Sequence, residues 1–397
     1  MAFLDAVKAS GVTDPDVLAA MAEVFREKHH PPEYAPLAGA DIPLPTHPRE
    51  VTQRPSPSPA VHGLLLQLLE LEPRLRVAVV DGDPYALALA ERLAAPGEVL
   101  GVAALIGAAV QPPFDRLLCL TAAVADAERF KGLLEDGGFA VFPRFGVSGP
   151  EVVKLLRGGT EFLEMRFTSL GPIGVGIPRQ DAVAAGGLAR SLAVNRLMEN
   201  AWTGTRDSPH DEHFAEVVSD TFEDPEVVKG RLPAEEYRRW EIARKAFACA
   251  YIRQSVGDLE AAADAYQASL AVRRTAEAHT FLGWTRSFQG KMEAAIEECH
   301  KAIAADPSFG NPYNDIGAYL LELGRVDESI PWFEKAKTSE RYCCHFYAYS
   351  NLGRAYLLKG MPEKARREFE EALKINPGYE FAREMLRRMG RGADHIA

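Results

Sequence analysis

The sequence predicts two folds in one chain, an α/β domain followed by an all-α solenoid of repeated helix pairs. Glycines recur at intervals of 33, 34 and 36 residues in the C-terminal part, which indicates a helical repeat. The length of 397 residues suits two or three domains, and each half is long enough to bury its own core. The α/β prediction rests on residue strings described below.

Charge and composition limit the function. The net charge is −11, and it is unevenly placed: the residues before 236 have a net charge of −12, and the rest have a net charge of +1. An acidic half of this kind binds nucleic acid and anionic membranes poorly, so neither is expected as a partner. The five cysteines form no CxxC pair, which favours a reducing compartment. No signal peptide is evident, and the longest apolar run is too short to span a bilayer, so we expect a cytoplasmic protein.

The recurring glycines of the C-terminal part mark the turns of one repeated unit. A small residue follows each turn by five positions, and a larger residue follows four positions later. A second glycine series, Gly283, Gly317 and Gly353, precedes the turns by seven. We expect the small residues to let two antiparallel helices approach, and the larger ones to fill the gap to the next helix. The turn glycines are Gly257, Gly290, Gly324 and Gly360, and the larger residues are Tyr266, Cys299, Phe333 and Phe369.

This phase resembles the tetratricopeptide repeat (TPR) family. We place four units at about 243–276, 277–309, 310–345 and 346–379 within a TPR domain of residues 237–397. Residues 380–390 read as the polar capping helix that a solenoid end needs. The resemblance implies that the concave groove, formed by the first helix of each unit, binds a protein or peptide.

Repeat phase gives the candidate residues of that groove. For each aromatic residue the alternative is packing between helices, and that alternative stays open. A chaperone-type carboxylate clamp would have Lys where Phe247 stands, so capture of a chaperone C-terminal tail is not expected. The candidates are Phe247, Tyr251, Thr280, Trp284, Asn311, Asn314, Tyr347, Ser350 and Arg354.

Residue strings scattered over residues 1–180 carry a second resemblance. They include TDPDVLAAM at 13–21, GLLLQLLEL at 63–71, PFDR at 113–116 and GGFAVFP at 137–143. These strings resemble protein-L-isoaspartate O-methyltransferases. The resemblance implies a Rossmann-like α/β domain that binds S-adenosylmethionine (AdoMet).

The cofactor positions of that family are altered in this chain. The family has a Gly-rich turn after the first strand, which lets the backbone approach the ligand, and an acidic residue at the end of the second strand. Here Val79 stands at the first acidic position, and Gly82 is the one glycine left. Asp81 and Asp83 add negative charge near the turn, and Ala103 replaces the second-strand acid. We therefore expect no cofactor.

The domain also looks truncated. Only 11 residues, Ala103 to Pro113, separate the second strand from the PFDR strand. One parallel crossover alone takes roughly 10–12 residues, so a βα unit with the adenine-binding loop is missing. The substrate-site motif of the family is broken as well, whether Thr52–Gln53 or Ser58–Pro59 is aligned with it.

Residues 181–236 form a mostly helical connecting region. Three residue pairs could suggest metal or redox chemistry, but each has a simpler structural interpretation as a helix start, a loop or a repeat junction. The pairs are His210 and His213, His29 and His30, and Cys343 and Cys344.

The sequence therefore favours a non-catalytic adaptor with a pseudo-methyltransferase domain and a partner-binding TPR groove. The alternative is an active AdoMet-dependent carboxyl methyltransferase whose repeats recruit the substrate protein. A third possibility is a maturation factor that grips a peptide without modifying it. A pocket able to hold an adenosine group distinguishes the first two.

Overall fold

The computed structural model describes residues 2–46, 55–80, 83–94, 99–102, 113–120, 130–146, 149–168, 171–173 and 179–393. The chain divides into two compact units. The N-terminal unit contains residues 1–218 and 232–272, and the repeat unit contains residues 219–231 and 273–397. Each unit is described by itself.

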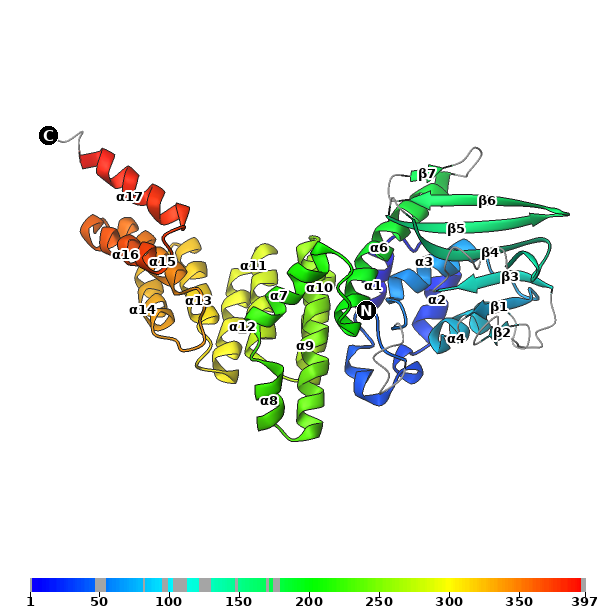
Figure 1. The fold of residues 1–397 in the computed structure, drawn as a ribbon, viewed down its shortest axis with the longest axis horizontal. Helices are drawn as coiled ribbons and strands as arrows, with labels where there is room; N and C mark the ends of the chain where they lie inside the picture. The colour runs from blue at the N-terminus through cyan, green and yellow to red at the C-terminus, as the bar shows by residue number, and fades with distance from the viewer. Residues whose placement is uncertain are drawn as a thin grey trace. The chain divides into compact units, whose positions relative to one another are not determined.

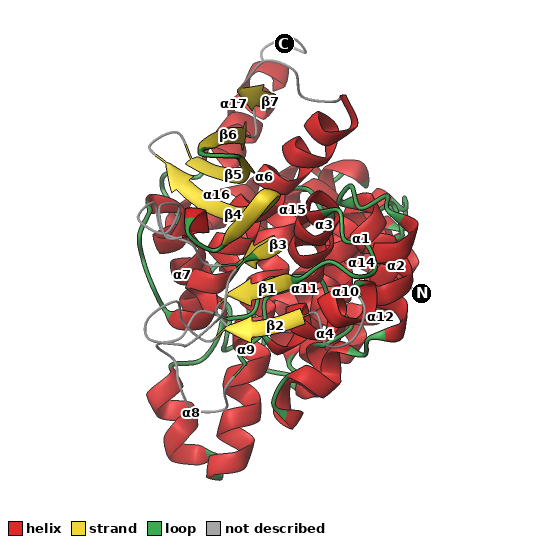
Figure 2. Ribbon diagram, turned by 90° about the vertical axis from the view of Figure 1, so that its right-hand side faces the viewer, coloured by secondary structure: helices red, strands yellow, loops and turns green. Residues whose placement is uncertain are grey.

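One seven-stranded sheet organises the N-terminal unit, in the order β2-β1-β3-β4-β5-β6-β7 (Figure 2). Its parallel half consists of β1 (Val77–Val80), β2 (Val99–Val102), β3 (Phe114–Cys119) and β4 (Leu134–Gly146). The strands β5 (Gly149–Gly158), β6 (Glu161–Thr168) and β7 (Gly171–Ile173) continue it in antiparallel fashion.

The α/β prediction is confirmed. The strand order also locates the short connection between β2 and β3, where the sequence predicts a missing βα unit. Among the described strands β2 forms one edge of the sheet, beside β1. The next described strand along the chain is β3, which pairs with β1 on its other side. Ala103 and the rest of the short connection, residues 103–112, lie outside the described residues.

Strand alternation gives each sheet face its own core. On one face Val77 and Val79 pack against the apolar side of α3 (Pro59–Leu69) and α4 (Pro84–Leu93). On the other face Ala78 and Val80 join a cluster with Phe142. The short elements α1 (Ala2–Ala9), α2 (Pro15–Glu23), η1 (Arg26–His29) and η2 (Pro32–Leu37) precede α3.

Helices after the sheet complete the N-terminal unit. Helix α6 (Arg179–Thr203) packs on the antiparallel strands and on α9 (Ala234–Ser255), which pairs with α10 (Leu259–Val272). The first predicted repeat is this α9–α10 pair. It clusters with the N-terminal unit rather than with the later repeats. Along the chain α7 (Pro209–Thr221) and α8 (Pro225–Arg231) come between α6 and α9, and α8 belongs to the repeat unit.

The repeat unit is a series of antiparallel helix pairs, coloured from yellow to red along the chain in Figure 1. The pairs are α11 (Ala276–Phe288) with α12 (Met292–Ala305), α13 (Asn311–Glu322) with α14 (Val326–Lys337), and α15 (His345–Leu358) with α16 (Pro362–Ile375). Helix α17 (Glu380–Ala393) follows where the capping helix was predicted.

The structure gives each glycine series a physical reason, the backbone freedom predicted for the turn series and close packing for the second series. The turn glycine Gly324 has a φ of +76°, a conformation that other residues rarely adopt. A Cβ on Gly317 would lie 2.5 Å from the ring of Phe333, and one on Gly353 would lie 2.9 Å from Phe369. Both rings are fully buried. Glycine in the first helix thus makes room for the aromatic side chain of the second.

Candidate functional site

The carboxyl end of β1 is where the predicted cofactor positions gather. Val79 is fully buried in the strand, so it contributes an apolar side chain where an acid was expected. Asp81 and Gly82 lie outside the described residues. Asp83 caps α4, and its carboxylate accepts a hydrogen bond of 2.7 Å from the backbone N–H of Ala86. Pro84 follows at the first helical position, where it supplies no N–H.

A buried histidine holds Asp83 from the opposite side. His62 of α3 is fully buried, with its Nε2 3.3 Å from Oδ1 of Asp83 and its Nδ1 3.1 Å from the carbonyl oxygen of Ser58. Both oxygens are acceptors, so the imidazole ring lies between two hydrogen-bond acceptors. Burial would raise the pKa of Asp83, but the hydrogen bond and charge of His62 outweigh it and hold that pKa well below its usual range.

More buried polar groups surround this pair. The Arg26 guanidinium donates to the carbonyl oxygens of Ala40, Ile42 and Pro57 and lies 5.9 Å from the ring centre of Tyr85. Burial, together with the charge of Arg26, lowers the pKa of His30 to about 3, so this imidazole is neutral at pH 7. We call these side chains the polar cluster. Its members are Arg26, His30, His62, Asp83 and Tyr85.

This arrangement has a chemical consequence for anion binding. The N-terminus of a helix after the first strand of an α/β sheet is where free N–H groups receive a ligand anion. In α4 the carboxylate of Asp83 already occupies that position. A ligand with a carboxylate would meet a fixed negative charge there.

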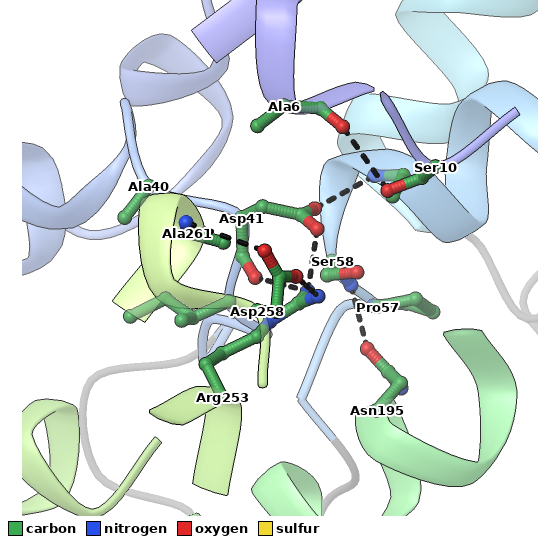
Figure 3. A network of polar contacts seen from close by, with 12 residues as sticks. Ala6, Ser10, Ala40, Asp41, Pro57, Ser58, Asn195, Arg253, Asp258 and Ala261 are labelled. Atoms are coloured by element: carbon green, nitrogen blue, oxygen red, sulfur yellow. Dashed lines mark hydrogen bonds and ion pairs between the residues drawn. The ribbon is translucent and has the colours of Figure 1, made fainter. Parts of the chain in front are cut away.

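The broken substrate-site motif has a structural role in this unit. Figure 3 shows the Ser58 N–H, just before α3, donating to Oδ1 of Asn195 in α6, at 2.8 Å. The same figure shows the buried ion pair of Asp41 with Arg253 of α9. Asp41 also accepts from the N–H of Ala60 at 2.8 Å. Thr52 and Gln53, the other alignment of that motif, lie outside the described residues.

The predicted groove residues divide by burial. Phe247 is fully buried and packs against Tyr266, with ring centres 5.4 Å apart, so it belongs to the interior of the α9–α10 pair. Thr280 and Ser350 are also buried, and Thr280 donates to the carbonyl oxygen of Ala276 within its own helix. Because these three side chains are buried, none of them lies on an accessible surface.

The remaining candidates are at least partly accessible. Tyr251 is half-buried, with its ring 5.9 Å from that of Phe214 in α7. Asn311 is half-buried at the start of α13. Tyr347 is 43% exposed on α15 and contacts the rings of Phe346 and Tyr379.

Hydrogen bonds join the other candidates into one row across three first helices. Trp284 Nε1 of α11 donates to Oδ2 of Asp315 in α13 at 2.6 Å, and the neighbouring Asn314 lies 3.4 Å from Oδ1. Asn351 of α15 donates to Oδ1 of Asn314 at 3.0 Å, and Arg354 donates to Oδ1 of Asn351 at 3.1 Å. We call these five residues the polar row.

Two members of the polar row were missed by the sequence analysis. Asp315 and Asn351 each directly follow a candidate, Asn314 and Ser350, so the repeat phase came within one residue of both. Burial raises the pKa of Asp315 to about 7, although the hydrogen bonds from Trp284 and Asn314 act in the opposite direction. The row therefore combines a buried titratable acid with an exposed guanidinium, that of Arg354.

The described part of the chain offers little for metal chemistry or membrane insertion. It holds no group of three or more His, Cys, Asp or Glu side chains placed to bind a metal ion. Ser208 caps α7 through the Asp211 N–H, as expected for the segment with His210 and His213. Within the same residues, every helix is too short or too polar to cross a membrane.

Comparison with curated proteins gives two groups of relatives. The N-terminal part is similar to the protein-L-isoaspartate O-methyltransferase of Methylorubrum populi, at 32% identity over 204 residues, which covers 45% of this chain and 93% of that protein. The enzyme of the same name from Roseobacter denitrificans is 30% identical and is covered to 93%. Since 45% of 397 residues is about 179, about 25 of the 204 aligned positions have no residue in this chain.

The C-terminal part matches the tetratricopeptide repeat family at residues 246–308 and 346–379. It is similar to the type IV pilus assembly protein PilF of Pseudomonas aeruginosa, at 29% identity over 136 residues, 32% of this chain and 53% of that protein. Among solved structures, PilF of Pseudomonas aeruginosa aligns with a TM-score of 0.38 at 22% identity, over 40% of this chain and 71% of that one.

Proposed function

Since the chain belongs over its N-terminal part to the protein-L-isoaspartate O-methyltransferase family, and since it carries tetratricopeptide repeats that imply protein–protein interaction, we propose that it is a non-catalytic adaptor. In this account the methyltransferase-like domain holds no AdoMet and serves as a scaffold. The repeats bind a protein or peptide partner.

The proposed loss of AdoMet binding rests chiefly on the Asp83–His62 pair. A binding loop for AdoMet needs free N–H groups and a backbone that the ligand can approach. In this chain a carboxylate caps that helix, and a buried histidine holds the carboxylate in place. The unmatched positions in the alignment support the same proposal, because a missing βα unit would remove the wall of the adenine site.

The polar row supports the choice of partner. The amides of Asn314 and Asn351 are bonded within the row, but each amide has a second N–H and a second oxygen lone pair, which suit the C=O and N–H groups of an extended peptide. Arg354 is exposed at one end of the row and provides a cation for a carboxylate. The partner class is therefore a peptide segment, held by its backbone and an acidic group.

A capture experiment tests the binding part of the proposal. The full chain is immobilised and compared with an Asn351→Ala, Arg354→Ala double variant. A partner retained by the wild type should be lost by the double variant and kept by the control Arg367→Ala, which removes an exposed arginine from α16. Equal retention by all three chains would contradict the assignment of the polar row.

The second candidate function is an active protein carboxyl methyltransferase whose repeats recruit the substrate. Coverage of 93% of an enzyme of that family favours it. It requires AdoMet binding and methyl transfer despite Val79 and the capped α4. A domain that grips a peptide without modifying it would bind substrate but not AdoMet.

A further inference from the structure

Two adjacent cysteines lie in the loop before α15. The Sγ atoms of Cys343 and Cys344 are 3.1 Å apart, and neither is in a disulfide. Cys343 is exposed and Cys344 is half-buried, whereas Cys119, Cys249 and Cys299 are buried. The proposed function uses neither thiol.

The loop that carries these thiols is held on both sides. The N–H of Arg341 donates to the carbonyl oxygen of Ser308, and the carbonyl oxygen of Arg341 accepts from Gly310, both at 3.0 Å. The Tyr342 side chain is buried, and it lies where a Cβ on Gly310 would collide with it, at 2.4 Å. Cys344 is itself the N-cap of α15. The two sulfur atoms are thus presented on a fixed backbone.

We propose that Cys343 and Cys344 form a vicinal dithiol that a low-molecular-weight disulfide, such as oxidised glutathione, reversibly oxidises to a disulfide. The Cys343 thiolate attacks one sulfur of the oxidant, whose S–S bond breaks and releases one thiol. The Cys344 thiol then loses its proton and attacks the Cys343 sulfur, which releases the second thiol. Two protein thiols are oxidised, and one small disulfide is reduced to two thiols.

Accessibility sets the order of these steps. Burial raises the pKa of Cys344 to about 12, and the neighbouring thiol of Cys343 and the charge of Asp220 act in the same direction. The exposed thiol therefore reacts first, since the thiolate is the nucleophile. The half-buried thiol acts as the resolving group.

The product is expected to be reducible. Adjacent Cα atoms are about 3.8 Å apart across a trans peptide, below the separations of about 4.4–6.8 Å that disulfides prefer. Strained, exposed disulfides are the labile ones. Because Cys344 stands at the N-cap position of α15, without a side-chain cap hydrogen bond, closing the ring acts on the backbone at the start of the helix that carries Asn351 and Arg354.

Mass spectrometry of the native full chain tests the proposal. After incubation with oxidised glutathione and digestion with trypsin, the peptide of residues 342–354 should lose two hydrogens, and dithiothreitol should restore its mass. Buried Cys249 and Cys299 should stay unmodified, which also reports that the chain is folded during the reaction. A persistent glutathione adduct or an unchanged peptide would overturn the proposal.

Two single variants separate the roles of the thiols. Cys344→Ser should stop at the glutathione adduct on Cys343, because no resolving thiol is left. Cys343→Ser should react with oxidised glutathione at about a tenth of the rate of Cys344→Ser, or more slowly still, because its one remaining thiol in the loop is half-buried. Equal reaction rates of the two variants would overturn the assigned order.

Discussion

The two units of this chain treat polar side chains in opposite ways. In the N-terminal unit, the polar groups around the end of β1 are buried: His62 contacts Asp83, whereas Nε2 of His30 and the hydroxyl of Tyr85 have no hydrogen-bond partner among the described residues. In the repeat unit, a comparable number of polar groups is arranged across three helices and ends at an exposed arginine. We infer from this difference that the N-terminal unit keeps the scaffold of its family, and that the polar side chains accessible to a partner lie in the repeats.

Breaking the buried ion pair of the N-terminal unit should have the largest effect on stability. Arg253→Ala should lower the free energy of unfolding by about 3–5 kcal/mol, because Asp41 would be left buried without its cation. Urea unfolding measures this loss. The control Arg92→Ala removes an exposed ion pair with Glu23 and should cost less than about 1 kcal/mol. Similar losses of unfolding free energy in the two variants would refute the distinction between the buried and the exposed ion pair.

Packing in the repeat unit should give the next effect. Gly317→Ala places a Cβ 2.5 Å from the Phe333 ring and should destabilise the chain by about 1–3 kcal/mol. Gly230→Ala in α8 has no atom within 4 Å of the added Cβ and should be nearly neutral. Thermal unfolding of both variants makes the comparison. A neutral Gly317→Ala would show that the helix pair relaxes around the methyl group.

The two units should respond to pH in opposite directions. The lowered pKa of Asp83 means that its contribution to stability is present above about pH 4 and is lost as the pH falls further. The pKa of Asp315 is raised to about 7, so the folded state binds the extra proton and loses stability as the pH rises from about 4 to 7. Each slope is at most about 1.4 kcal/mol per pH unit.

Hydrogen exchange followed on peptides from each unit measures these slopes separately. Asp315→Asn should flatten the slope of the repeat unit and leave that of the N-terminal unit unchanged. Asp83→Asn should do the reverse. A common slope in both units would count against the two assignments.

The smallest expected effect on stability is that of the exposed end of the polar row. Arg354→Ala should change the free energy of unfolding by less than about 0.5 kcal/mol, because the side chain is exposed and makes one hydrogen bond. The same variant should weaken partner binding, measured by the capture experiment. Loss of stability together with binding would make Arg354 a structural residue.

Regular patterns were predictable from the sequence, and closely packed contacts were not. The glycine spacing located the helix pairs because a glycine in the first helix leaves room for the aromatic ring of the second, as Gly317 does for Phe333. The same phase could not tell Phe247, which faces its own helix pair, from Trp284, which reaches the polar row. Helical phase gives the face of a residue but not the neighbour that covers it.

The N-terminal site shows a second limit of sequence reasoning. The loss of the expected acid at Val79 and the added charge of Asp83 were both visible as departures from a family pattern. The partner of Asp83 was not, because His62 is 21 residues away and lies on another helix. A buried pair of this kind is formed by tertiary packing alone.

Isothermal calorimetry of the purified full chain with AdoMet and S-adenosylhomocysteine tests whether the N-terminal unit has lost its cofactor site. From the carboxylate cap on α4 and the Asp83–His62 pair we expect no heat of binding for either ligand, even at ligand concentrations on the order of 1 mM, which corresponds to a binding free energy weaker than about −4 kcal/mol. Saturable binding with a Kd on the order of 1 μM would contradict the claim, and the methyltransferase account would then replace it.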